Sequence, residues 1–279
     1  MNLFRTVVLM TALTLLLVLA GGILGGQGGA LTALIVAGVL NLGSYWFSDK
    51  IVLRMYRGKQ VQHGPLYDVV RELCLRNNMP MPRVYVLPQA TPNAFATGRN
   101  AQHAVVAATE GLLRSLNREE LTGVMAHELS HVRHRDILIG SIAATIAGAI
   151  GFLAHMARWA ALFGGSGGRD REEGGPFGLI LLMIFGPLAA MLVQMAISRS
   201  REYAADRGAA QLCGNPQALA GALRKLEDAN RQRPMAQASE ATAHMFIVNP
   251  LRSGGLAALF STHPPVAERI KRLEGMNAL

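Results

Sequence analysis

Four long apolar runs alternate with stretches of mixed polarity along the chain. The runs cover residues 6–24, 31–47, 137–157 and 177–197, and none contains Asp, Glu, Lys or Arg. An α-helix rises about 1.5 Å per residue, so runs of this length match the hydrocarbon core of a bilayer, which is about 30 Å thick. Residues 159–175 contain GGSGG and RDREE, a composition typical of a flexible connector. The pattern predicts four transmembrane helices in two hairpins.

The first run has a second interpretation, as a secretory signal, because Arg5 precedes it. The run is longer than a usual signal core, however, and a second apolar run follows after a short Gly-rich turn. A transmembrane hairpin within residues 1–49 therefore fits the pattern better. Tyr45 and Trp46 then lie where interfacial aromatic residues belong.

The stretches outside the apolar runs have the patterns of a folded aqueous domain. Residues 65–76 carry apolar side chains at the spacing of an amphipathic helix. Three short β-prone pieces, separated by Pro or Gly, predict a small meander. These pieces are residues 83–87, 93–97 and 103–107.

Asn117 and Glu120 have the spacing of a capping box and predict that a helix begins there. No stop signal follows Asp136, so we expect one long helix to pass from the aqueous domain into the third apolar run. The predicted organisation has four parts. They are a transmembrane hairpin at residues 1–49, an aqueous part at 50–136, a second hairpin with its connector at 137–197, and a second aqueous part at 198–279.

Composition and charge favour a membrane protein. Of the 279 residues, 51% are hydrophobic, and the formal net charge is +9, which together are unusual for a soluble enzyme. Nucleic acid is a poor explanation for the charge, because aromatic residues are only 6% of the chain and no nucleic-acid-binding motif is present. Lys and Arg number twelve in residues 49–136 and eleven in residues 199–279, against three in the second hairpin turn. The positive-inside rule predicts that both termini and both aqueous parts face the cytoplasm.

The two cysteines, Cys74 and Cys213, are far apart and form no CxxC pair. The sequence therefore predicts neither a disulfide framework nor a thiolate metal site. Free thiols in a reducing compartment are the simplest interpretation.

The chemistry of the chain centres on the segment AHELSHVRHRD at residues 126–136. His127 and His131 are four residues apart, so on a helix they share one face and can hold one metal ion. Glu128 follows the first histidine and can reach water at that metal, where it would act as general base. The alternative is a solvent-exposed helix face without function, in which the HExxH pattern occurs by chance. Two imidazoles suit zinc, although cobalt or manganese could occupy the same site.

A hydrolytic zinc site needs a third protein ligand, and Glu202 is the best candidate. His131 lies six residues before the third apolar run, and Glu202 lies five residues after the fourth. If these two runs are antiparallel helices, both side chains stand about 8–9 Å above the membrane boundary. Asp206 shares the helix face of Glu202 and could accept a hydrogen bond from a ligand imidazole. The alternative for both acids is a solvated charged face.

Four motifs together resemble the HtpX family of membrane zinc metallopeptidases, relatives of the eukaryotic CAAX prenyl proteases. They are PNAFATG, HELSH, REYAADR and STHPP, in this order and with matching apolar runs. The resemblance implies a mainly α integral membrane protein with four transmembrane helices and an α+β, gluzincin-like zinc metallopeptidase domain with a small β-sheet. It implies one Zn²⁺ per chain, with His127, His131 and Glu202 as ligands, Glu128 as general base, and Asp206 supporting a ligand from outside the coordination sphere.

The resemblance also assigns roles to five residues that the local pattern does not. It places Asn93, Ala94 and Phe95 beside the active site, where an extended substrate would pair with the backbone there or on the following strand, near residues 105–107. Without the family, Asn93 is a turn residue after a proline. The two remaining residues, His263 and Arg269, match positions that face the cleft and stabilise the oxyanion. Without the family, His263 is a structural loop histidine.

These observations predict a multi-pass zinc endopeptidase of the bacterial inner membrane with a cytoplasmic active site. By resemblance, its substrates are misfolded or damaged membrane proteins and unfolded polypeptides, in envelope quality control under stress. Two alternatives stay open, a site-specific processing protease of the CAAX type and a non-enzymatic metal-binding membrane protein. The partners expected are the lipid bilayer and polypeptide substrates, with no nucleic acid. The sequence does not indicate an oligomeric state.

Overall fold

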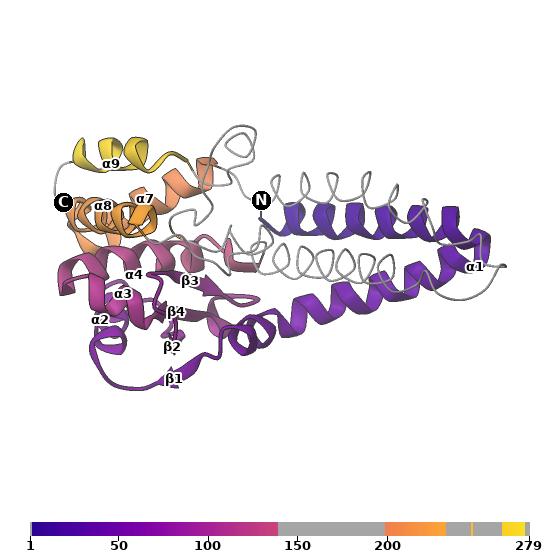
Figure 1. Cartoon of the computed structure of the whole chain (residues 1–279), viewed down its shortest axis with the longest axis horizontal. Helices are drawn as coiled ribbons and strands as arrows, with labels where there is room; N and C mark the ends of the chain where they lie inside the picture. The colour runs from indigo at the N-terminus through magenta and orange to yellow at the C-terminus, as the bar shows by residue number, and fades with distance from the viewer. Residues whose placement is uncertain (1, 139–198, 233–246, 248–263, 277–279) are drawn as a thin grey trace.

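The computed structural model describes residues 2–138, 199–232, 247 and 264–276. The predicted second hairpin, with its connector at residues 159–175, and His263 lie outside these residues. Figure 1 shows an elongated helical hairpin that projects from a domain in which helices pack around a small sheet. The N-terminus lies beside this domain, and the C-terminal helix lies on the side away from the hairpin.

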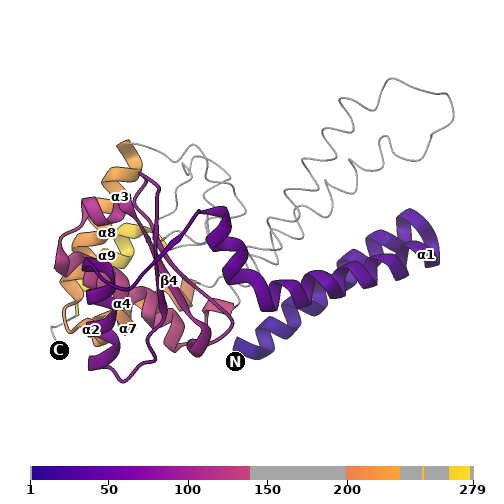
Figure 2. The same cartoon turned by 90° about the horizontal axis from the view of Figure 1, so that it is seen from below.

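Residues 2–55 form one continuous helical element, α1 (Asn2–Met55), that folds back on itself. Gly26 has a positive φ of 57°, and a Cβ atom at Gly21 or Gly29 would collide with the backbone of the other glycine. The two legs are joined further along by a hydrogen bond of 2.8 Å that Asn41 Nδ2 donates to Thr14 Oγ1. Figure 1 shows the two legs meeting at the turn and diverging toward the domain, and Figure 2 shows the same hairpin from below. The hairpin predicted from the Gly-rich turn is therefore present.

Among the described residues, one segment has the length and composition of a membrane span, Gly26–Phe47. Its apolar side chains are largely uncovered, since Val39 and Leu42 are 66% and 64% exposed. The other leg contains a shorter apolar stretch, Met10–Leu19. An apolar surface this exposed is expected of a helix that faces lipid.

A four-stranded mixed sheet has the order β1-β2-β4-β3. The meander predicted from the sequence is wrong, because β4 lies between the other two predicted strands, parallel to β2 and antiparallel to β3. All five residues of β4, VVAAT, are buried. Such a run, without polar alternation, is typical of a central strand covered on both faces. The strands are β1 (Lys59–Val61), β2 (Arg83–Leu87), β3 (Ala94–Thr97) and β4 (Val105–Thr109).

The helix α4 (Arg118–Arg133) is the centre of the domain and packs against α2, α7, α8 and β3. Three of its residues are fully buried, Val124, Met125 and Leu129. They belong to the same apolar cluster as Leu219 and Leu223. The remaining helices are α2 (Pro65–Arg76), η1 (Ala101–His103), α3 (Glu110–Ser115), α7 (Arg199–Cys213), α8 (Pro216–Gln232) and α9 (Val266–Glu274).

Two glycines allow the neighbours of α4 to approach closely. A Cβ atom on Gly123 would lie 2.5 Å from the backbone nitrogen of Leu219 in α8. On the other side, a Cβ atom on Gly208 of α7 would overlap the hydroxyl of Ser130 in α4. These contacts fix the separation of α4 from α7, and that separation decides whether side chains on the two helices can share a ligand.

Both ends of α4 have clear causes. The predicted capping box is present, because Asn117 Oδ1 accepts from the Glu120 backbone and Glu120 Oε2 accepts from the Asn117 backbone, each at 2.9 Å. The predicted continuation past Asp136 is wrong: the helix ends at Arg133 in a Schellman turn. Arg135 is left-handed, with φ 60°, and the Asp136 N–H donates to the His131 carbonyl at 2.9 Å. Glycine usually marks this position, so an arginine there gave no stop signal in the sequence.

Candidate metal centre

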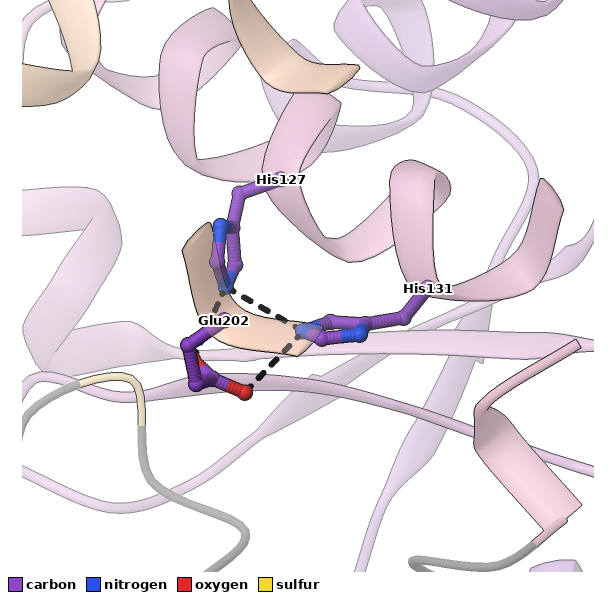
Figure 3. A group of neighbouring side chains, drawn as sticks. All are labelled: His127, His131 and Glu202. Carbon is purple, nitrogen blue, oxygen red and sulfur yellow. Dashed lines mark hydrogen bonds and ion pairs between the residues drawn. The ribbon is translucent and has the colours of Figure 1, made fainter. Parts of the chain in front are cut away.

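Three donor side chains from α4 and α7 converge on one point (Figure 3). His127 and His131 lie one turn apart on α4, and Glu202 extends from the first turn of α7. His127 Nε2 is 3.3 Å from His131 Nε2, and Glu202 carboxylate oxygens lie 3.6 Å from each of these two nitrogens. Candidate ligand atoms of the three residues all lie within 4.8 Å of one another.

This spacing fits a tetrahedral metal ion. Two ligand atoms about 2.0–2.1 Å from a zinc ion, at tetrahedral angles, are about 3.3–3.4 Å apart. The observed separations of 3.3 and 3.6 Å need only small side-chain adjustments to meet this value. Two imidazoles and one carboxylate also leave the fourth position free for water or substrate, as a hydrolytic site requires. The three residues therefore suit a divalent metal such as zinc.

The second nitrogen of His127 faces a buried carboxylate. His127 Nδ1 lies 3.0 Å from Asp206 Oδ1, and Asp206 is one turn along α7 from Glu202. Complete burial of His127 lowers its pKa, but the contacts with Asp206 and Glu202 outweigh this effect and raise the pKa to about 9. The two carboxylates thus favour a positive charge on this imidazole, and the contact of Asp206 with Nδ1 leaves Nε2 facing the other two donors.

Asp206 is itself fixed by Arg269 of α9. Arg269 Nε and Nη2 donate to the two Asp206 oxygens at 2.9 and 2.7 Å, a bidentate ion pair. Burial raises the pKa of Asp206, but the Arg269 guanidinium and His127 lower it by more than this, so that the pKa is about 2. The carboxylate is therefore ionised at any physiological pH and can always accept from His127.

Arg269 is not placed as the resemblance predicted. Its side chain is fully buried, at 0% exposure, and Nη1 donates to the Ile247 carbonyl at 2.9 Å. Burial lowers its pKa, but Asp206, Glu202 and Glu128 outweigh this effect, so the pKa lies above its usual range. The described contacts give Arg269 a positioning role behind the metal ligands, and they lend no support to direct contact with an oxyanion.

Asp136 supports the other histidine, and the sequence reasoning missed it. Its Oδ2 atom lies 3.4 Å from His131 Nδ1, so both candidate imidazoles have a carboxylate beside the nitrogen that does not face the centre. The Schellman turn after α4 brings Asp136 back over His131. The available signal is an acid five residues after His131, which the predicted continuous helix does not bring onto the same face.

Asn93 contributes a polar contact from the sheet to this network. Its Oδ1 atom accepts from the Ile247 backbone at 3.3 Å, and Ile247 in turn accepts from Arg269. The backbone N–H of Asn93 also donates a hydrogen bond of 2.9 Å to Thr109 Oγ1. The predicted position beside the active site thus corresponds to a short chain of contacts that leads from Asn93 to Asp206.

Ala94 and Phe95 begin β3, at the edge of the sheet. Both side chains are buried, at 0% and 3% exposure, so a substrate at these two residues could contact only their backbone. In the described residues β3 pairs on one side alone, with β4. The alternative pairing site at residues 105–107 is wrong, because β4 already has a strand on each side. Glu128 is buried on α4, at 5% exposure, next to His127.

The chain is similar to known peptidases over most of its length. The profile described as Peptidase family M48 matches residues 60–277. "Protease HtpX homolog" of Syntrophotalea carbinolica is 76% identical over 279 residues, which cover all of both chains. The protein of the same description from Thermococcus kodakarensis is 54% identical and is matched over 96% of this chain and 94% of its own. Among solved structures, S. mikatae Ste24p aligns with a TM-score of 0.52 at 21% identity, over 98% of this chain and 65% of that chain.

Proposed function

Because the chain belongs to peptidase family M48 and is a membrane metalloprotease of the HtpX kind, we propose that it is a zinc endopeptidase that cleaves misfolded or damaged membrane proteins. The observation that carries the proposal is the convergence of His127, His131 and Glu202, with Glu128 next in the chain to the first ligand. The peptidase family also removes the non-enzymatic alternative.

The proposed division of labour assigns each side chain one task. His127, His131 and Glu202 hold the ion, which when bound supplies Lewis acidity that polarises a peptide carbonyl and makes water nucleophilic near neutral pH. Glu128 takes a proton from the attacking water and returns it to the leaving amine. Asp206 and Asp136 hold the two imidazoles so that their Nε2 atoms face the centre.

The edge of β3 that has no strand partner among the described residues is the proposed site for the substrate backbone. An extended peptide can add to such an edge through main-chain hydrogen bonds, which do not depend on its side chains. This mode would suit an enzyme that accepts many unfolded sequences. Asn93, at the start of the strand, would fix its position through Thr109 and Ile247. His263 stays a predicted oxyanion donor, outside the described residues.

The orientation is likewise a proposal. Four transmembrane helices, with both termini and the active site in the cytoplasm of a bacterium, follow from the apolar runs and the distribution of Lys and Arg. The exposed apolar face of Gly26–Phe47 supports the first hairpin. A hydrolytic site close to the bilayer suits substrates that emerge from it.

The test is cleavage of casein, an unstructured protein, by the purified chain in detergent with zinc. We expect cleavage that a chelator stops, and a loss of about a hundredfold or more in Glu128→Ala without loss of the metal. Glu119→Ala, an exposed acid on the same helix, is the matched control and should cleave normally. Unchanged activity in Glu128→Ala would contradict the mechanism.

The same assay separates the proposal from a site-specific processing enzyme of the CAAX type. A processing enzyme should ignore casein and cleave only its own short motif. Beyond a fold shared with Ste24p, nothing in the described part of the chain favours that second function. Cleavage of a CAAX peptide without cleavage of casein would favour it.

A further inference from the structure

A pocket of about 310 Å³ lies where the end of α1 meets the sheet domain, on residues that the catalytic proposal does not use. Six of its lining residues matter here: two are aromatic, three are cationic and one is acidic. They are Trp46, Phe47, Asp49, Lys50, Arg83 and Arg99. Because α1, β2 and the segment after β3 all contribute, the pocket is formed by the tertiary fold.

The pocket carries an excess of positive charge. Arg83 is paired with Asp49 at 2.5 Å, which neutralises one cation. Arg99 lies over the Trp46 ring, with Cζ 4.6 Å from the centroid, and Lys50 Nζ lies 5.4 Å from the Phe47 centroid. In the described part of the chain, neither Arg99 nor Lys50 has a carboxylate partner within ion-pair distance. The aromatic rings hold both cations without neutralising them.

The position of the pocket along α1 defines its surroundings. The membrane-length segment Gly26–Phe47 ends inside it. Tyr45 and Trp46 pack edge to face, with centroids 5.5 Å apart, at the depth where aromatic side chains occupy a membrane interface. One wall therefore continues into an exposed apolar helix face, and the other belongs to the aqueous domain.

We propose that this pocket binds the phosphate of an anionic phospholipid headgroup. Arg99 and Lys50 would contact the phosphate, since guanidinium and ammonium groups are the usual partners of phosphate oxygens. The acyl chains would lie along the exposed face of α1, where Leu42 and Val39 are uncovered. This continuity with an apolar surface favours a lipid over a soluble phosphate compound. Such a lipid would fix the domain at a set height on the membrane, whether or not the chain cleaves its proposed substrates.

The test is native mass spectrometry of the full chain, released from micelles that contain phosphatidylglycerol or phosphatidylcholine. We expect the wild type to retain phosphatidylglycerol in preference to phosphatidylcholine. The double variant Lys50→Gln, Arg99→Gln should retain at least fivefold less phosphatidylglycerol than the wild type. Arg54→Gln, Lys59→Gln removes the same charge from exposed neighbouring positions outside the pocket and should bind normally.

Three results would overturn the proposal. One is equal retention of both lipids by the wild type, a comparison that needs no variant. Another is an equal loss in both double variants, which would assign the binding to general surface charge. The third is displacement of the lipid by glycerol phosphate or inorganic phosphate at equal concentration, since that would make the ligand a soluble phosphate.

Discussion

Each candidate imidazole has one nitrogen at the metal centre and the other beside a carboxylate. Asp206 contacts Nδ1 of His127 and accepts two hydrogen bonds from Arg269. Asp136, in the turn after α4, contacts Nδ1 of His131. A carboxylate in this position fixes the tautomer of a ligand histidine and raises its basicity. The residues behind the ligands should therefore control metal affinity.

Replacing Asp206 by Asn tests this control. The amide keeps the shape but removes the charge that Arg269 binds and that orients His127, so we expect zinc affinity to fall about 10–100-fold. Competition with a chromophoric chelator measures the affinity. Asp68→Asn, an exposed acid on α2, is the control and should match the wild type. Wild-type affinity in Asp206→Asn would show that the contact is structural only.

Cys74 should be unreactive while the protein is folded. It is 3% exposed, and burial raises the pKa of its thiol from 9.0 to about 11. At pH 8 the folded protein then has roughly a hundredfold less Cys74 thiolate than the unfolded chain, and only the thiolate attacks an alkylating reagent. Mass spectrometry after iodoacetamide treatment, with and without denaturant, gives both rates. Equal rates in the two states would contradict this account of burial.

At the scale of elements, the site depends on how closely α7 and α8 pack against α4. Gly123 brings the α8 backbone near, and Gly208 does the same for α7. Added side-chain volume at such contacts forces the helices apart, and overpacking of this kind commonly costs about 1–3 kcal/mol.

Two alanine substitutions at the same pair of helices should have opposite effects. In Gly123→Ala the new methyl group meets the Leu219 backbone, which cannot rotate away, so we expect about 1–3 kcal/mol of destabilisation. In Gly221→Ala the nearest atoms lie at an ordinary 3.5 Å, and the lower entropy of the unfolded chain should stabilise by about 0.4–1 kcal/mol. Thermal unfolding of the two variants in detergent measures both. Equal melting temperatures would show that the helices adapt freely.

Local signals predicted the elements well, and non-local contacts explain the errors. The apolar spacing in residues 65–76 and the capping box at Asn117 each identified a real helix boundary. The strand order could not be predicted from the sequence, because β4 pairs directly with β2 although β3 lies between them in the sequence. The end of α4 was missed because Arg135 adopts a left-handed conformation that sequence patterns assign to glycine.

The candidate ligands could be identified from the sequence because their spacing reflects helix geometry. His127 and His131 needed only a helix, and Glu202 needed only an antiparallel neighbour. The environment of Arg269 could not be predicted, since α9 is far from α7 in the chain and the Ile247 carbonyl belongs to a segment without periodicity. Residues such as Arg269, which orient the ligands without binding the metal themselves, have no characteristic spacing in the sequence.

At the scale of the whole molecule, the metal centre joins two segments separated by residues 139–198. α4 contributes two donors and α7 the third, and their contact is among the most extensive between elements of the described chain. The helical hairpin of α1 carries an exposed apolar surface of membrane-spanning length, and the pocket at its end lies against the sheet. The fold thus places the candidate metal centre and the candidate membrane span in one unit.

The zinc content of the purified chain and of its Glu202→Ala variant tests the central claim most directly. Elemental analysis should give about one zinc per wild-type chain, because the three donors form a single site. Glu202→Ala should lose most of this zinc at the same total concentration, whereas Asp228→Ala, an exposed acid on α8, should keep it. A full complement of zinc in Glu202→Ala, or none in the wild type, would contradict the account.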